Sequence, residues 1–161
     1  MNEEYKQWIK QGKIDYEKRM NTYTDETIAL AMHLGLYDVE DVCLNEEDDY
    51  LILTDDDANI ELFARVTDDL WLFNPSFLAG ETGLDEDVFK ALQANGEGES
   101  LCKNIRSLID TTCGIDEFVT AASDADGRGH FLAPYDGEEH EVTVQRGPNE
   151  KAETYYIYRV N

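Results

Sequence analysis

The sequence has few basic residues and no long hydrophobic run, and each shortage excludes a class of protein. Only 13 Lys and Arg stand against 36 Asp and Glu among 161 residues, which gives a net charge of −23. Binding to DNA or RNA needs basic patches, so this charge argues against a nucleic-acid-binding domain. The longest apolar stretch, residues 28–36, is interrupted by His33 and Gly35 and is too short to cross a bilayer. We therefore expect no direct contact with nucleic acid or membrane.

Cysteine is scarce as well, and its spacing predicts a reducing compartment. The three cysteines, Cys43, Cys102 and Cys113, form an odd set without a CxxC pair. Disulfide scaffolds use even, closely spaced sets, so no disulfide framework is expected. The first residues, MNEEYKQW, lack the basic and apolar segments of a signal peptide. Together these features predict a cytoplasmic protein.

Motifs for catalysis and for metal binding are also missing. The sequence contains no P-loop, dinucleotide-binding or GxSxG pattern. Residues 124–135 follow part of the spacing of a calcium loop, but Arg128 and Tyr135 stand where oxygen ligands are required. A Gly-rich turn leading into a strand is therefore expected over residues 123–131. The histidines and cysteines lack zinc-ligand spacing, so no metal and no other cofactor is expected.

The residues that are present favour a folded domain with a highly charged surface. Hydrophobic residues make up 42% of the chain and aromatic residues 11%, which is more than a disordered acidic tail contains. A chain of this length can bury a proper core as a single domain. We expect one domain over residues 1–161, with a nearly neutral helical part at 1–37, a strongly acidic part at 38–99 and a hairpin at 124–161.

Hydrophobic spacing predicts an α+β fold. Helices are expected over 3–20, from Asp25 to a stop at Gly35 with Thr24 as the N-cap, from residue 55 to a stop at Asn74-Pro75, from residue 85 to Gly96, and over 101–109 and 115–122. The helix from residue 55 would bury the apolar residues that recur every four positions, Ala58, Leu62, Val66 and Leu70. The helix from residue 85 would turn Val88, Phe89 and Leu92 inward. Strands are expected at 50–53, 141–146 and 154–160, the last two joined by a turn at 147–149. Several short helices would pack on one side of a small antiparallel sheet built from this C-terminal hairpin and the strand at 50–53.

The negative charge is uneven along the chain. Residues 38–99 hold nineteen Asp and Glu against two basic residues, Arg65 and Lys90, which is −17 of the total −23. Salt adaptation, the plainest alternative, would spread the acids more evenly. Acids at a helix start can cap it and complement the helix dipole, but one or two for each helix are enough. The surplus therefore indicates a surface that is selected to be negative.

Such a surface can imitate the backbone of DNA. B-DNA carries one phosphate charge for about every 1.7 Å of its axis, and its binders neutralise these charges with Lys and Arg. Carboxylates four positions apart on a helix lie about 5–6 Å apart, close to the spacing of successive phosphates on one strand. The residues predicted to form this surface, named the acidic belt below, are Glu46, Glu47, Asp48, Asp49, Asp55, Asp56, Asp57, Glu61, Asp68, Asp69, Asp85, Glu86 and Asp87.

On its size, its acidic belt and its lack of active-site motifs, the whole chain resembles the small acidic DNA-mimic proteins of phages and mobile elements, the antirestriction and anti-CRISPR inhibitors. The C-terminal segments DGRGHFLAPYDGEEHEV and YYIYRVN also resemble the ends of small phage-type proteins. No motif matches an inhibitor residue by residue, so no functional position is transferred. The resemblance implies a non-enzymatic inhibitor in the host bacterial cytoplasm. Its partner would be a basic DNA-binding protein such as a restriction enzyme, a CRISPR effector or a repair glycosylase, and a homodimer would lengthen its charged surface.

Two other functions stay open. An acidic adaptor could bind a partner through aromatic or apolar side chains near residues 5–23, with Trp8 as its strongest contact and with charge for solubility and steering. A small enzyme could use an unrecognised site around Cys113, His130 and Asp136.

Overall fold

The computed structural model describes residues 22–35 and 47–161. The chain divides into two compact units. The first contains the residues up to Asp55 together with His140–Asn161, and the second contains Asp56–Glu139. The helix expected over residues 3–20 and the aromatic residues up to position 21 lie outside the described residues, so that part of the adaptor hypothesis stays a prediction.

The first unit is built on a three-stranded antiparallel sheet in the order β1-β3-β2. Its strands are β1 (Tyr50–Leu53), β2 (His140–Val144) and β3 (Glu153–Arg159), and a short 3₁₀ turn, η1 (Glu47–Asp49), precedes β1. Leu51 pairs with Tyr158 across β1 and β3, and Val142 pairs with Tyr155 across β2 and β3. The predicted C-terminal hairpin and its pairing with the strand at 50–53 are both confirmed.

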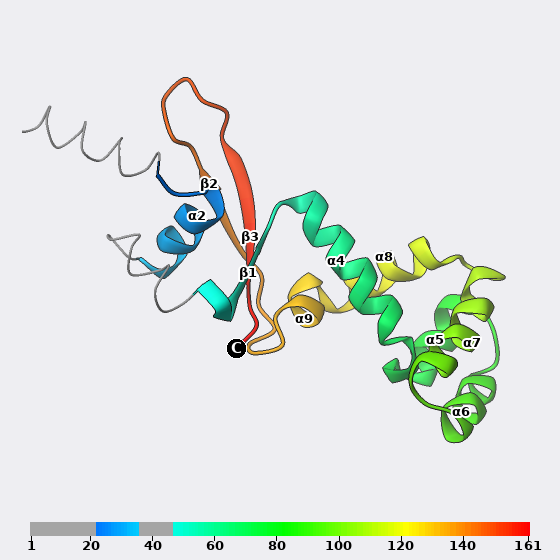
Figure 1. Cartoon of the computed structure of the whole chain (residues 1–161). Helices are drawn as coiled ribbons and strands as arrows, with labels where there is room; N and C mark the ends of the chain where they lie inside the picture. The colour runs from blue at the N-terminus through cyan, green and yellow to red at the C-terminus, as the bar shows by residue number, and fades with distance from the viewer. Residues whose placement is uncertain (1–21, 36–46) are drawn as a thin grey trace, which may run out of the picture. The chain divides into compact units, whose positions relative to one another are not determined.

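One described helix, α2 (Asp25–Leu34), packs on this sheet (Figure 1). Thr24 caps its start, because the hydroxyl accepts a hydrogen bond from the Thr27 amide, and Gly35 ends it in the left-handed conformation at φ 66°. Both ends lie where the sequence predicts them. Ile28 of the helix and Ile157 of β3 are fully buried in the core between helix and sheet.

The second unit is helical. It contains α4 (Asp55–Asp68), the 3₁₀ turn η2 (Leu70–Leu72), α5 (Pro75–Thr82), α6 (Glu86–Asn95), α7 (Gly98–Asp110), α8 (Ile115–Asp126) and α9 (Arg128–Leu132). Its core is formed by large side chains that are fully buried, among them Leu70, Leu78, Phe89, Ile105 and Phe118.

Helix α4 has the amphipathic pattern that its sequence predicts. The apolar residues that recur every four positions along the segment, Ala58, Leu62, Val66 and Leu70, are all buried. The predicted end of this helix is wrong, however. The helix ends at Asp68, and Asn74-Pro75 begins α5, because the Asn74 side chain accepts a hydrogen bond from the Ser76 amide and Pro75 fits the first helical turn.

Two further local expectations are corrected. The segment expected to turn into a strand near residues 123–131 is helical, since α8 continues to Asp126 and α9 follows after Gly127. Val88, expected to face inward, is 42% exposed, whereas its neighbour Phe89 is buried. The α+β class, with helices and a small antiparallel sheet that includes the C-terminal hairpin, is confirmed. That the chain forms one domain stays a prediction.

Candidate functional site

The acidic belt begins in the first unit. Glu46 lies outside the described residues, as does the side chain of Glu47. Asp48 is exposed. Asp49 has a structural role, because its carboxylate accepts a hydrogen bond from the Asn161 side chain at 2.9 Å and its carbonyl accepts one from the Val160 amide at 2.8 Å.

Most of the described belt residues lie on α4 and at its ends. Asp55, Asp56 and Asp57 form the exposed first turn of the helix. Glu61 is partly exposed and pairs with Arg65 one turn further on, at 2.9 Å. The first-turn acids complement the positive end of the helix dipole, as the capping explanation requires.

Asp68 and Asp69 lie at the other end of α4, and both are exposed. This end of a helix carries the negative end of the dipole, so a carboxylate here costs stability instead of adding it. Asp69 also stands at the N-cap position of η2, but its side chain makes no capping hydrogen bond, so capping does not account for it.

The last belt segment starts α6. The Asp85 carboxylate accepts a hydrogen bond from the Asp87 amide at 2.9 Å and caps the helix. Glu86 and Asp87 both contact Lys90, with N–O distances of 3.0 and 3.6 Å. The hydrogen bond to Glu86, together with the charge of that carboxylate, raises the pKa of Lys90. Local helix chemistry therefore explains this segment well.

The second unit as a whole is strongly negative. It contains nineteen Asp and Glu and five Lys and Arg, for a net charge of −14. Each of the five basic side chains already contacts an acid: Arg65 with Glu61, Lys90 with Glu86, Lys103 with Glu99, Arg106 with Asp110 and Arg128 with Glu139. Five cations cannot neutralise nineteen carboxylates, so the unit presents a large uncompensated charge to its surroundings.

The predicted acidic belt leaves out two exposed acidic residues of the second unit that stand in a similar position to Asp68 and Asp69. Asp124 and Asp126 are exposed in the last turn of α8, which contains no basic residue. Like Asp68 and Asp69, they stand at the negative end of a helix. Their position just before Gly127 was the signal for a helix end, but we interpreted the segment as a turn into a strand.

The carboxyl ends of α4 and α8 both border a cavity of about 300 Å³ within the second unit. Its lining includes Arg65, Asp69, Phe73, Asp126, His130 and Phe131. The rings of Phe73 and Phe131 are nearly parallel, at 18°, with centroids 6.1 Å apart. Asp69 of the acidic belt is thus placed beside a concave and partly aromatic surface.

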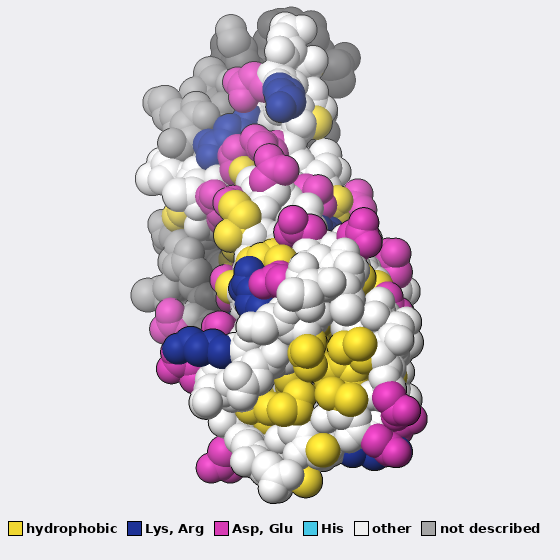
Figure 2. Space-filling model, turned by 90° about the vertical axis from the view of Figure 1, so that its right-hand side faces the viewer, with side chains coloured by type: hydrophobic (Ala, Val, Ile, Leu, Met, Phe, Trp, Pro, Cys, Tyr) yellow, Lys and Arg dark blue, Asp and Glu magenta, His cyan; other side chains and the backbone are white. Residues whose placement is uncertain are grey.

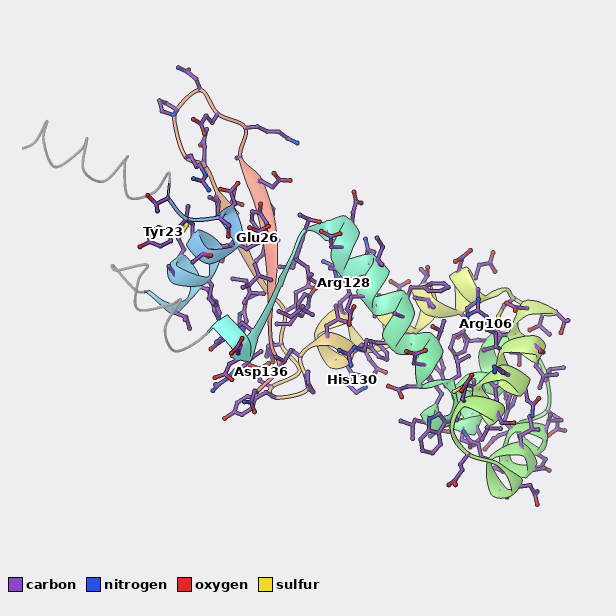
Figure 3. All side chains as sticks on the ribbon, in the orientation of Figure 1. Tyr23, Glu26, Arg106, Arg128, His130 and Asp136 are labelled. Atoms are coloured by element: carbon purple, nitrogen blue, oxygen red, sulfur yellow. The ribbon has the colours of Figure 1, made fainter. Side chains whose placement is uncertain are left out.

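The residues of the enzyme hypothesis do not share this cavity. Figure 3 shows His130 on α9 and Asp136 on the turn that follows it. The Asp136 carboxylate accepts a hydrogen bond from the Glu138 amide at 3.0 Å, and Cys113 lies in the turn between α7 and α8. Of the three, His130 alone is among the residues that line the cavity. No group of three or more His, Cys, Asp or Glu within residues 22–35 and 47–161 is arranged to hold a metal ion.

Comparison with known proteins gives no relative. The chain matches no protein-family model, no curated protein and no solved structure. Within the part of the chain that the structure describes, no helix has the length and apolarity needed to span a membrane.

Proposed function

We propose that this protein is a non-enzymatic inhibitor that presents a DNA-like acidic surface to a basic DNA-binding protein of a bacterial host, such as a restriction enzyme or a CRISPR effector. The belt residues of the second unit, together with Asp124 and Asp126 of the same unit, would occupy the channel that normally holds DNA. The protein would act in the host cytoplasm, where such enzymes meet DNA.

The observation that carries this proposal is the set of carboxylates at helix C-termini. Asp68, Asp69, Asp124 and Asp126 are exposed at the ends of α4 and α8, where a carboxylate meets the negative end of the helix dipole. Functional surfaces often carry residues that are unfavourable for stability. An interaction with a positive surface is a purpose that a carboxylate can serve at any exposed position.

The net charge of the second unit supports the same function. A charge of −14 on 84 residues exceeds what solubility requires, which is a magnitude of about 2–8 for a small domain. It would also steer the protein toward a basic partner and accelerate association at low salt.

Neutralising chosen acids tests the proposal. The triple variant D56N/D68N/D69N removes exposed belt charges, and its effects on the dipole of α4 oppose one another because its changes lie at both ends. Capture of DNA-binding proteins from a bacterial lysate by the tagged variant is expected to weaken about tenfold, since each exposed charge pair contributes about 0.2–1 kcal/mol.

The matched control is E97Q/E117Q/E138Q, which removes the same charge from exposed residues of the same unit that lie outside the belt and away from the last turns of helices. It is expected to retain more of the captured protein than the belt variant does. If the two variants lose the partner equally, the effect is one of net charge and the belt is not the binding surface.

A second candidate, the protein–protein adaptor, is favoured by one observation. Figure 2 shows apolar side chains gathered on one face of the second unit, with Asp and Glu around the margin. Leu72, at 60% exposed, and Val88 are large apolar residues of this unit that remain at the surface. An adaptor would lose its partner on Leu72→Ser and would keep it in the belt variant.

A further inference from the structure

The cavity at the ends of α4 and α8 has the electrostatics of a cation site. Asp69 directly follows the last residue of α4, and Asp126 is the last residue of α8. Two carboxylates and the C-terminal ends of α4 and α8 therefore border the same space, together with Asn74 at the positive N-terminal end of α5. Asp69 and Asp126 form no ion pair with another residue of the described ranges.

The basic residue of the cavity does not cancel this charge. The guanidinium of Arg65 lies 2.9 Å from the Glu61 carboxylate, so its charge is partly compensated from its own helix. His130 is exposed on α9, and its ring contacts that of Phe131 edge to face, with centroids 4.9 Å apart. Apart from Arg65, the fixed charges on the cavity wall are negative.

The aromatic side chains of the lining indicate which kind of cation the cavity would bind. Phe73 and Phe131 present phenyl rings to the cavity, and both are partly exposed. A guanidinium is planar, is more weakly hydrated than an ammonium, stacks on aromatic rings and pairs with carboxylates through two parallel hydrogen bonds. A wall with both carboxylates and phenyl rings therefore suits arginine better than lysine.

We propose that this cavity binds the guanidinium of an arginine side chain supplied by the partner protein. The inference rests on the proposed function, because proteins that bind DNA use arginine widely to contact phosphates and base edges. A partner arginine that otherwise contacts DNA would enter the cavity between Asp69 and Asp126. Its guanidinium would lie along the ring of Phe73 or Phe131. A buried arginine anchor of this kind supplies much of the affinity in many protein interfaces.

A titration of the ¹⁵N-labelled full-length protein with N-acetyl-L-arginine amide tests the cavity directly. Amide signals of residues around the cavity, such as Phe73 and His130, are expected to shift more than those of α2. The lysine analogue is expected to bind several times more weakly. D69N and D126N should each weaken binding of the arginine probe about fivefold, as expected for loss of one partly exposed charge pair.

Each variant has a close control on its own helix or turn. Asp124 lies two positions before Asp126 on α8, which places it on the other side of the helix, and it lines a different cavity with Asp116. Asp68 precedes Asp69 and lines a third cavity with Trp71. D124N and D68N remove the same charge and are expected to leave probe affinity within about twofold of wild type.

The outcomes separate this inference from the proposed function. Equal loss in all four variants, or no shift around the cavity, overturns the arginine site even if DNA-binding proteins are captured from a lysate. Equal binding of the lysine analogue overturns the choice of a guanidinium. Probe binding at the cavity without capture of any DNA-binding protein overturns the proposed function. The same result overturns the assignment of the arginine to a DNA-binding partner.

Discussion

The two units of this molecule are built by different means. The first depends on pairing between distant segments, because β1 at residues 50–53 joins β3 at 153–159. The second is assembled from consecutive helices whose apolar faces form the core, with Leu62, Phe89 and Ile105 among its buried residues. Because these faces fold the second unit, its polar faces are free to carry a net charge of −14. In the second unit, the residues that form the core are therefore distinct from the residues that carry the charge.

The largest expected effect is on the stability of the second unit, at a glycine that has no room for a side chain. A Cβ at Gly129 would lie 2.4 Å from the Gly137 carbonyl oxygen and 2.8 Å from the carbonyl carbon of Glu138, and both are backbone atoms. Gly129→Ala is expected to destabilise the protein by about 3 kcal/mol, measured by urea unfolding.

Gly80→Ala is the matched control. It lies within α5 and a Cβ there meets nothing within 4 Å, so the change should leave stability unchanged or raise it by up to about 1 kcal/mol. Equal stability of the two variants would show that α9 does not pack closely against residues 137–139.

An intermediate effect concerns the first unit at high pH. Burial raises the pKa of Tyr155 to about 12, and the carboxylates of Glu26 and Asp25 add to the rise. The folded pKa lies above the ordinary value near 10, so this tyrosine contributes stability that is complete below about pH 10 and is lost as the pH rises to about 12.

Between pH 9 and pH 11 the wild type is therefore expected to lose about 1 kcal/mol relative to Tyr155→Phe, which cannot ionise. Urea unfolding of both proteins at the two pH values measures the difference. A constant difference would contradict the buried environment of Tyr155 in the first unit.

The smallest expected effect tests whether surface ion pairs hold the second unit together. Lys90 is well exposed and contacts Glu86 and Asp87. Lys90→Met is expected to change the Tm by less than about 2 °C, because exposed pairs contribute little. A decrease in Tm of more than about 5 °C would show that the ion pairs of Lys90 contribute substantially to the stability of the second unit.

Local patterns predicted much of the fold. The caps at Thr24 and Gly35 fixed both ends of α2, and the four-residue spacing from Ala58 identified the buried face of α4. The alternation of apolar and polar residues predicted the two strands of the C-terminal hairpin. The start of α5 was missed because Asn74-Pro75 fits both the end of one helix and the beginning of the next, and only the structure shows which.

The candidate site was predictable only in part. The runs of acids are visible in the sequence, but whether an acid stands at the favourable or unfavourable end of a helix depends on where the helix stops. The ends of α4 and α8 were misplaced, so the cost of Asp68 and Asp126 could not be recognised. The cavity combines Asp69 with Asp126 through tertiary packing, which no sequence spacing reveals.

The proposed function requires that the acidic surface binds a protein that otherwise binds DNA. The most direct measurement is a pull-down with the tagged protein from bacterial lysate, eluted in steps of salt, with and without added duplex DNA, and analysed by mass spectrometry. DNA-binding proteins are expected to elute between roughly 0.2 and 0.5 M salt and to be displaced by DNA, because carboxylate rows and phosphates compete for the same Lys and Arg. A partner that stays bound through high salt and is indifferent to DNA would contradict it.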